Sequence, residues 1–102
     1  MPTPIRTERN IALYETILKL QTVEDCIDFF EDLCAVTELS AIEQRFEVAQ
    51  MLRAGKVYAD ILAATGASSA TVSRVNRMLR DSKGCLSRLL AGQDAEKEGA
   101  GV

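Results

Sequence analysis

The sequence predicts an all-α fold, and three observations support this. Its apolar residues recur at three- and four-residue spacing, its two prolines lie within the first four residues, and no stretch alternates between apolar and polar residues as a strand would. A chain of 102 residues is long enough for one domain with a modest hydrophobic core. We therefore expect a helical domain over residues 7–90, between an N-terminal arm and a C-terminal tail.

Residues 1–6 are predicted to form a flexible N-terminal arm, because Pro2 and Pro4 oppose helix formation. A first helix should begin near Thr7 and run to about Leu20, since its apolar residues form one stripe. That stripe consists of Ile11, Tyr14, Ile17 and Leu18.

Thr22 is predicted to cap a second helix over residues 23–36, with Asp25 three residues further on as in a capping box. Apolar residues cover much of this helix, so it must be buried on more than one side. They are Val23, Cys26, Ile27, Phe29, Phe30, Leu33, Cys34 and Val36. Because a chain of this size offers too little of its own surface, we expect a homodimer whose N-terminal helices share one core. The alternative is a compact monomer that covers this helix well.

A third helix is predicted to begin at Ser40, because Ser40 and Glu43 have the spacing of a capping box. Gly55 should end it, since glycine tolerates the positive φ common after a helix C-terminus. Its expected core face consists of Ile42, Phe46, Ala49 and either Met51 or Leu52.

Residues 58–80 are predicted to form two helices joined by a tight turn at Gly66. Ser68 or Ser69 can accept hydrogen bonds from the N–H groups that open the second of these helices. Three- and four-residue spacing puts its apolar residues on one face, which holds Val72, Val75 and Leu79. This layout is that of a helix-turn-helix, whose second helix lies in the DNA major groove.

The opposite face of that second helix carries small residues and arginines. Small residues allow a close approach to base edges, serine and threonine can bond bases or phosphates, and arginine can be bidentate to guanine. This face holds Ser69, Ala70, Ser73, Arg74 and Arg77. We therefore expect a sequence-specific DNA-binding transcriptional regulator. The alternative is a helical protein-interaction module that uses the helix-turn-helix only as a scaffold.

The expected DNA complex is a homodimer with two such helices in successive major grooves, about 34 Å apart. Ser69, Ala70 and Ser73 should touch base edges. The residues expected mainly at phosphates are Arg74, Arg77, Lys56 and Arg53. Bound at a promoter, the dimer would most simply block polymerase, which makes a repressor the default expectation.

Charge is divided unevenly along the chain, whose net charge is −3. Residues 1–52 carry four basic and ten acidic side chains, whereas residues 53–90 carry seven basic and two acidic ones. The positive charge thus gathers on and around the predicted DNA-reading helix, while the acidic remainder disfavours other contacts with phosphates.

The composition also indicates which classes of protein are disfavoured and where in the cell the protein is expected. The chain has no histidine, no metal-ligand spacing, no phosphate-binding glycine loop and no readable nucleophile–base arrangement, so we expect no enzyme, no metal and no cofactor. Its three cysteines are an odd number, which disfavours a disulfide framework. With no signal peptide and no long apolar run, we expect a cytoplasmic protein without a membrane span.

The C-terminal region is predicted to hold one last short helix that packs back on the core. Its apolar residues are Cys85, Leu86, Leu89 and Leu90. The small and polar residues 91–102 are expected to be disordered.

From Thr37 onward the chain resembles the bacterial Trp repressor superfamily, and more closely its YerC/YecD branch. The matching strings are E-L-S-A-I-E-Q-R-F-E-V-A-Q-M-L-R-A-G-K at 38–56 and I-L-A-A-T-G-A-S-S-A-T-V-S-R-V-N-R-M-L at 61–79. The resemblance implies an interlocked all-helical homodimer that binds DNA as a transcriptional regulator. The residues that match the family's DNA-contacting positions are Ser68, Ser69, Ala70, Thr71, Ser73 and Arg74.

One departure concerns the tryptophan corepressor. In the tryptophan-responsive repressor an arginine of the recognition helix is followed by a glycine, and both help to form the corepressor pocket. Arg74 matches that arginine, but Val75 replaces the glycine. A branched side chain would fill space that an indole needs, so we expect no tryptophan corepressor.

Overall fold

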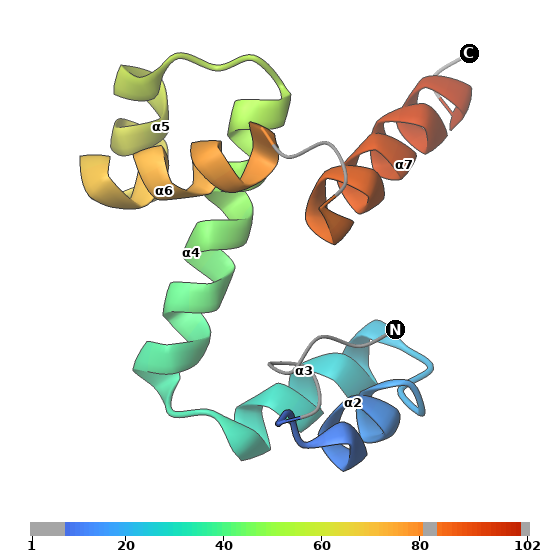
Figure 1. Cartoon of the computed structure of the whole chain (residues 1–102). Coiled ribbons are helices and arrows are strands. Elements are labelled where there is room, and N and C mark those ends of the chain that lie inside the picture. The colour runs from blue at the N-terminus through green and yellow to red at the C-terminus, as the bar shows by residue number, and fades with distance from the viewer. Residues whose placement is uncertain (1–7, 81–83, 101–102) are drawn as a thin grey trace. The chain divides into compact units, whose positions relative to one another are not determined.

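The computed structural model describes residues 8–80 and 84–100, which form six α-helices and no strand (Figure 1). The helices are α2 (Ile11–Ile17), α3 (Val23–Leu33), α4 (Val36–Arg53), α5 (Tyr58–Thr65), α6 (Ser69–Arg80) and α7 (Cys85–Ala100). The predicted all-α fold is confirmed. The expected arm over residues 1–6 and the expected helix start at Thr7 lie outside the described residues. The chain divides into two compact units, Met1–Leu39 and Ser40–Val102.

In the first unit both complete helices begin at a side-chain cap. Asn10 accepts a hydrogen bond from the Leu13 N–H at 3.4 Å and caps α2. Thr22 Oγ1 accepts from the Asp25 N–H at 3.0 Å and caps α3, as predicted. Asp25 completes the cap by accepting from the Gln21 N–H at 3.2 Å. Helix α3 ends at Leu33, earlier than expected.

The first unit buries no side chain among its described residues, 8–39. Phe29 and Phe30 are half-buried and meet edge to face, with ring centroids 5.2 Å apart. The large apolar residues that remain exposed are Ile11, Tyr14, Leu18, Val23, Ile27, Leu33 and Val36. The apolar excess of the N-terminal helices is therefore uncovered in the single chain.

The prediction that a helix begins at Ser40 was wrong. Helix α4 begins at Val36, and Ser40 lies within it. Glu38 Oε1 accepts a hydrogen bond from the Ala35 N–H at 2.7 Å, which satisfies the backbone where the helix opens. This bond is the half of a capping box in which an acidic side chain accepts from the N–H of the residue before the helix.

The second unit contains the buried core. Its fully or nearly fully buried residues are Val48, Ala49, Ile61, Ala67, Val72, Val75 and Leu90. Met51, Leu52, Leu62, Leu79 and Leu86 pack against them. The prediction that Ile42 and Phe46 of α4 face the core was wrong for the single chain, in which Ile42 is 44% exposed and Phe46 is 40% exposed. The core side of α4 holds Val48 together with Ala49, the member of the expected face that is buried as predicted.

Helix α7 packs on this core through Leu90 and Leu86, as predicted. It runs to Ala100, although residues 91–102 were expected to be disordered. The segment can continue the helix because alanine, glutamate, glutamine and lysine are good helix formers. The three cysteines, Cys26, Cys34 and Cys85, form no disulfide.

Candidate nucleic-acid interface

Helices α5 and α6 form the predicted helix-turn-helix, and they lie against α4 in the second unit (Figure 1). Gly66 ends α5 in the left-handed conformation, with φ of 70°. Its N–H donates to the Leu62 carbonyl at 3.0 Å. A residue with a Cβ would be strained at this φ, so glycine is favoured at the turn.

Ser68 caps α6. Its hydroxyl oxygen accepts from the Thr71 N–H at 3.1 Å, and its hydroxyl donates to Thr71 Oγ1 at 3.0 Å. Of the two serines considered as caps, Ser68 thus has this role. Ser69 is the first helical residue and its side chain is exposed.

Helix α6 has two distinct faces. Val72 and Val75 are buried and Leu79 is half-buried, so one face is fixed in the core. The other face is exposed and holds Ser69, Ala70, Ser73, Arg74 and Arg77, as the spacing predicted. Thr71 is half-buried at the edge between the two faces.

Lys56 and Arg53 lie at the end of α4, where the chain turns toward α5. Gly55 has φ of 81°, its N–H donates to the Leu52 carbonyl at 3.0 Å, and the Lys56 N–H donates to the Met51 carbonyl at 3.0 Å. These two bonds form a Schellman motif, which ends α4 at the expected glycine. Both basic side chains are exposed.

The turn itself is held by two residues that sequence reasoning missed. Gln44 of α4 donates from Nε2 to the Thr65 carbonyl at 3.1 Å. Thr65 Oγ1 donates to the Ile61 carbonyl at 2.7 Å and accepts from the Ala67 N–H at 3.1 Å. Neither residue was assigned a role from the sequence. The four-residue spacing of Gln44 to Val48 was the signal that Gln44 shares the core side of α4.

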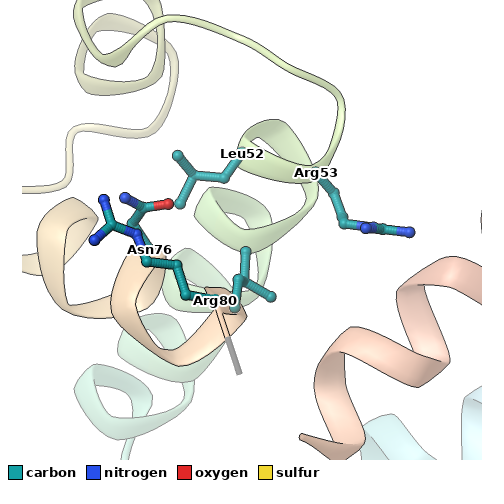
Figure 2. Close-up of a pocket in the computed structure, with 5 residues that line it drawn as sticks. Leu52, Arg53, Asn76 and Arg80 are labelled. Atoms are coloured by element: carbon teal, nitrogen blue, oxygen red, sulfur yellow. The ribbon is translucent and has the colours of Figure 1, made fainter. Parts of the chain in front are cut away.

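Arg80 is a further exposed cation that the expected site omitted. It lies seven residues after Ser73 and eleven after Ser69, so helical spacing brings the three residues onto one stripe of α6. Figure 2 shows its guanidinium beside the amide of Asn76, whereas Arg53 points away from both. These residues, with Leu52 and Leu79, line a cavity of about 210 Å³ between the ends of α4 and α6.

Val75 is 1% exposed and belongs to the core. Its side chain therefore fills space in the interior, on the side of α6 that faces the core. Among the side chains that the structure describes, those of residues 8–80 and 84–92, no group of three or more histidine, cysteine, aspartate or glutamate residues could hold a metal ion. Across the same residues, no helix is both long and apolar enough to cross a membrane.

Comparisons with known proteins agree with this architecture. The family model described as Trp repressor protein matches residues 9–94. The YerC protein of Bacillus subtilis (strain 168), which is described as uncharacterized, is 51% identical over 67 residues. That match covers 66% of this chain and 64% of the YerC chain, which is just under two thirds of the relative's length.

Two solved structures are similar over most of the chain. One is described as a candidate Trp repressor from Staphylococcus aureus; it has a TM-score of 0.79 and 38% identity, with 91% of this chain and 96% of that chain covered. The other is a TrpR-like protein from Eubacterium eligens ATCC 27750, with a TM-score of 0.76 and 43% identity, covering 81% and 86% of the two chains. Since the family model spans most of its length, this chain belongs to the Trp repressor family.

Proposed function

We propose that this protein is a sequence-specific DNA-binding transcriptional regulator that inserts α6 into the major groove. The observation that carries the proposal is the division of α6 into two faces. Val72 and Val75 fix the helix in the core, and the exposed side presents Ser73, Arg74 and Arg77. A rigid helix with small polar and guanidinium groups on its free side suits the hydrogen-bonding groups of the major groove.

The positions of these residues along α6 and at the end of α4 favour base contacts for some and phosphate contacts for others. Ser69, Ala70 and Ser73 lie in the first half of the helix, where small side chains allow close approach to base edges. Arg74 has the reach for a guanine or a phosphate, and Arg77 lies further along the same exposed face. Lys56 and Arg53, at the end of α4, add cations at the edge of this surface and suit phosphates.

The protein acts as a homodimer in this proposal. Residues 8–39 bury no side chain in the single chain, and in the second unit Ile42 and Phe46 are also exposed. A second copy would cover these exposed apolar side chains, and their burial would stabilise the dimer by roughly 25 cal/mol for each Å² removed from water. Two copies of α6 could then reach successive major grooves on one side of the duplex. Bound over a promoter, the dimer would exclude polymerase and so act as a repressor.

The salt dependence of duplex binding tests this function. Fluorescence anisotropy of a labelled random duplex should show affinity that falls by one or more orders of magnitude between about 50 and 200 mM salt, because phosphate contacts release counterions. Binding that does not change with salt, or no binding at 50 mM, would contradict a DNA-binding role.

A further inference from the structure

The hydrogen bond between Gln44 and the turn connects α4 to the proposed DNA-reading helix. Gln44 donates to the Thr65 carbonyl at 3.1 Å, across 21 positions of sequence. That carbonyl is one of the last four of α5, which have no partner within the helix. The bond therefore satisfies a backbone group of the turn from outside the helix-turn-helix.

The other polar groups of the turn are satisfied locally. Thr65 Oγ1 accepts from the Ala67 N–H at 3.1 Å and donates to the Ile61 carbonyl at 2.7 Å. The Gly66 N–H donates to the Leu62 carbonyl at 3.0 Å. Of the hydrogen bonds described for this turn, the one from Gln44 is the bond that reaches it from another helix.

The apolar contacts around this bond are less directional than the hydrogen bond itself. Val48 lies one helical turn after Gln44 on the same side of α4, and with Ile61 and Val72 it is fully buried. Apolar burial is proportional to area and has no preferred orientation. A hydrogen bond has a narrow range of distances and angles, so it constrains the position of the Thr65 carbonyl relative to Gln44.

We propose that Gln44 is a positioning residue for DNA recognition, and that it sets the placement of the first turn of α6 by holding the Thr65 carbonyl. Ser69 and Ala70 follow Thr65 by four and five residues, and the intervening residues are Gly66, Ala67 and Ser68. A displacement of the turn is therefore carried directly to the residues proposed at base edges. Base readout requires placement within about 0.5 Å, whereas phosphate attraction tolerates more.

This inference rests on the proposed DNA-binding function and adds a separable claim to it. Loss of the bond should weaken binding to a preferred duplex and leave binding to a random duplex nearly unchanged. If Gln44 served only stability, its substitution would reduce the folded fraction and would weaken binding to both duplexes by the same factor.

The test compares Gln44→Met with Gln50→Met in the full-length protein. Methionine keeps the length and apolar contacts of glutamine but has no amide donor. Gln50 is an exposed glutamine of the same helix, so its substitution is a matched control. Each variant and the wild type are titrated against a duplex selected from a random pool and against a random duplex. Circular dichroism measures the folded fraction.

Specificity is the dissociation constant for the random duplex divided by that for the preferred duplex. For Gln44→Met this ratio should fall about three- to tenfold, the change expected for one lost hydrogen bond. For Gln50→Met the ratio should equal that of the wild type. The salt dependence of random-duplex binding should be unchanged in both variants. If Gln44→Met does not fold, Gln44→Asn replaces it, because that amide is one methylene too short to reach the carbonyl.

The outcomes separate the two claims. A wild-type protein that prefers no duplex overturns the proposed function and this inference together. A wild-type preference that Gln44→Met or Gln44→Asn retains in full overturns this inference and leaves the function standing. Equal weakening on both duplexes also overturns it, since that result assigns Gln44 to stability alone.

Discussion

The hydroxyl of Ser87 donates a hydrogen bond to the carbonyl oxygen of Leu79, at 3.2 Å. This bond joins α7 to the last turn of α6, where helix carbonyls have no partner within the helix. Leu86 and Leu90 pack on the core beside it. The C-terminal end of α6 is thus hydrogen-bonded to α7, and the turn before α6 is hydrogen-bonded to α4.

Ser87→Ala should lower the free energy of unfolding by about 0.5–1.5 kcal/mol, because it leaves the Leu79 carbonyl without its partner. Chemical denaturation measures the change. Ser40→Ala, at an exposed position within α4, is the matched control and should change stability much less. Equal stability of the two variants would remove Ser87 from the account of how α6 is held.

Ser68 and Ser69 are neighbours with different expected roles. Ser68→Ala removes the cap of α6 and should cost about 1 kcal/mol of stability, measured by thermal or chemical unfolding. Ser69→Ala should leave stability nearly unchanged and weaken binding to the preferred duplex. The opposite pattern, with Ser69→Ala destabilising and Ser68→Ala neutral, would show that the two roles are reversed.

Arg74→Ala and Arg77→Ala should weaken DNA binding in different ways. If Arg74 contacts a base, its loss should cost about 1–3 kcal/mol on the preferred duplex and relax specificity. Loss of Arg77 from a phosphate should weaken all duplexes similarly and reduce the salt slope by about 1. Arg88→Ala, an exposed arginine of α7, is the control and should bind as the wild type does. A gel-shift or anisotropy titration in which Arg74→Ala matches that control would remove Arg74 from the site.

Phe46→Asp should dissociate the homodimer without unfolding the single chain. Phe46 is 40% exposed in one chain, so a charge there meets solvent in the monomer but an apolar surface in the proposed dimer. Sedimentation and circular dichroism should report a folded monomer. Ser40→Asp adds the same charge at an exposed position on another side of α4 and should remain dimeric. A folded dimer for Phe46→Asp would exclude Phe46 from the interface.

Tryptophan should not tighten DNA binding by this protein. Val75 is 1% exposed and fills interior space at the position where the tryptophan-responsive repressor has a glycine. Isothermal titration calorimetry should detect no uptake of tryptophan at micromolar concentration, and duplex affinity should be the same with and without it. Micromolar uptake would contradict the argument from Val75.

Local sequence signals were enough to predict the helix-turn-helix. Gly66 needs positive φ, Ser68 caps the next helix, and the spacing of Val72 and Val75 defines the buried face. Each of these depends on residues within one or two helical turns. The predicted cap of α3 at Thr22 and the predicted buried face of α6 were therefore confirmed.

Two of the wrong predictions concern α4, namely where it starts and which side faces the core. At its start the Glu38 carboxylate accepts from the Ala35 N–H, a contact that the search for a serine or threonine cap did not reveal. Its core side includes Gln44, a polar residue that can be half-buried because it donates to the Thr65 carbonyl 21 residues away. Periodicity alone favoured the side with Ile42 and Phe46, because both sides of α4 carry apolar residues.

Selection of preferred duplexes from a random pool tests the central claim most directly. At about 100 mM salt the protein should enrich a sequence with two half-sites about one helical turn apart, and it should bind that duplex at least about 1,000-fold more tightly than a random one. Equal affinity for the enriched and random duplexes would contradict the claim that α6 reads DNA sequence.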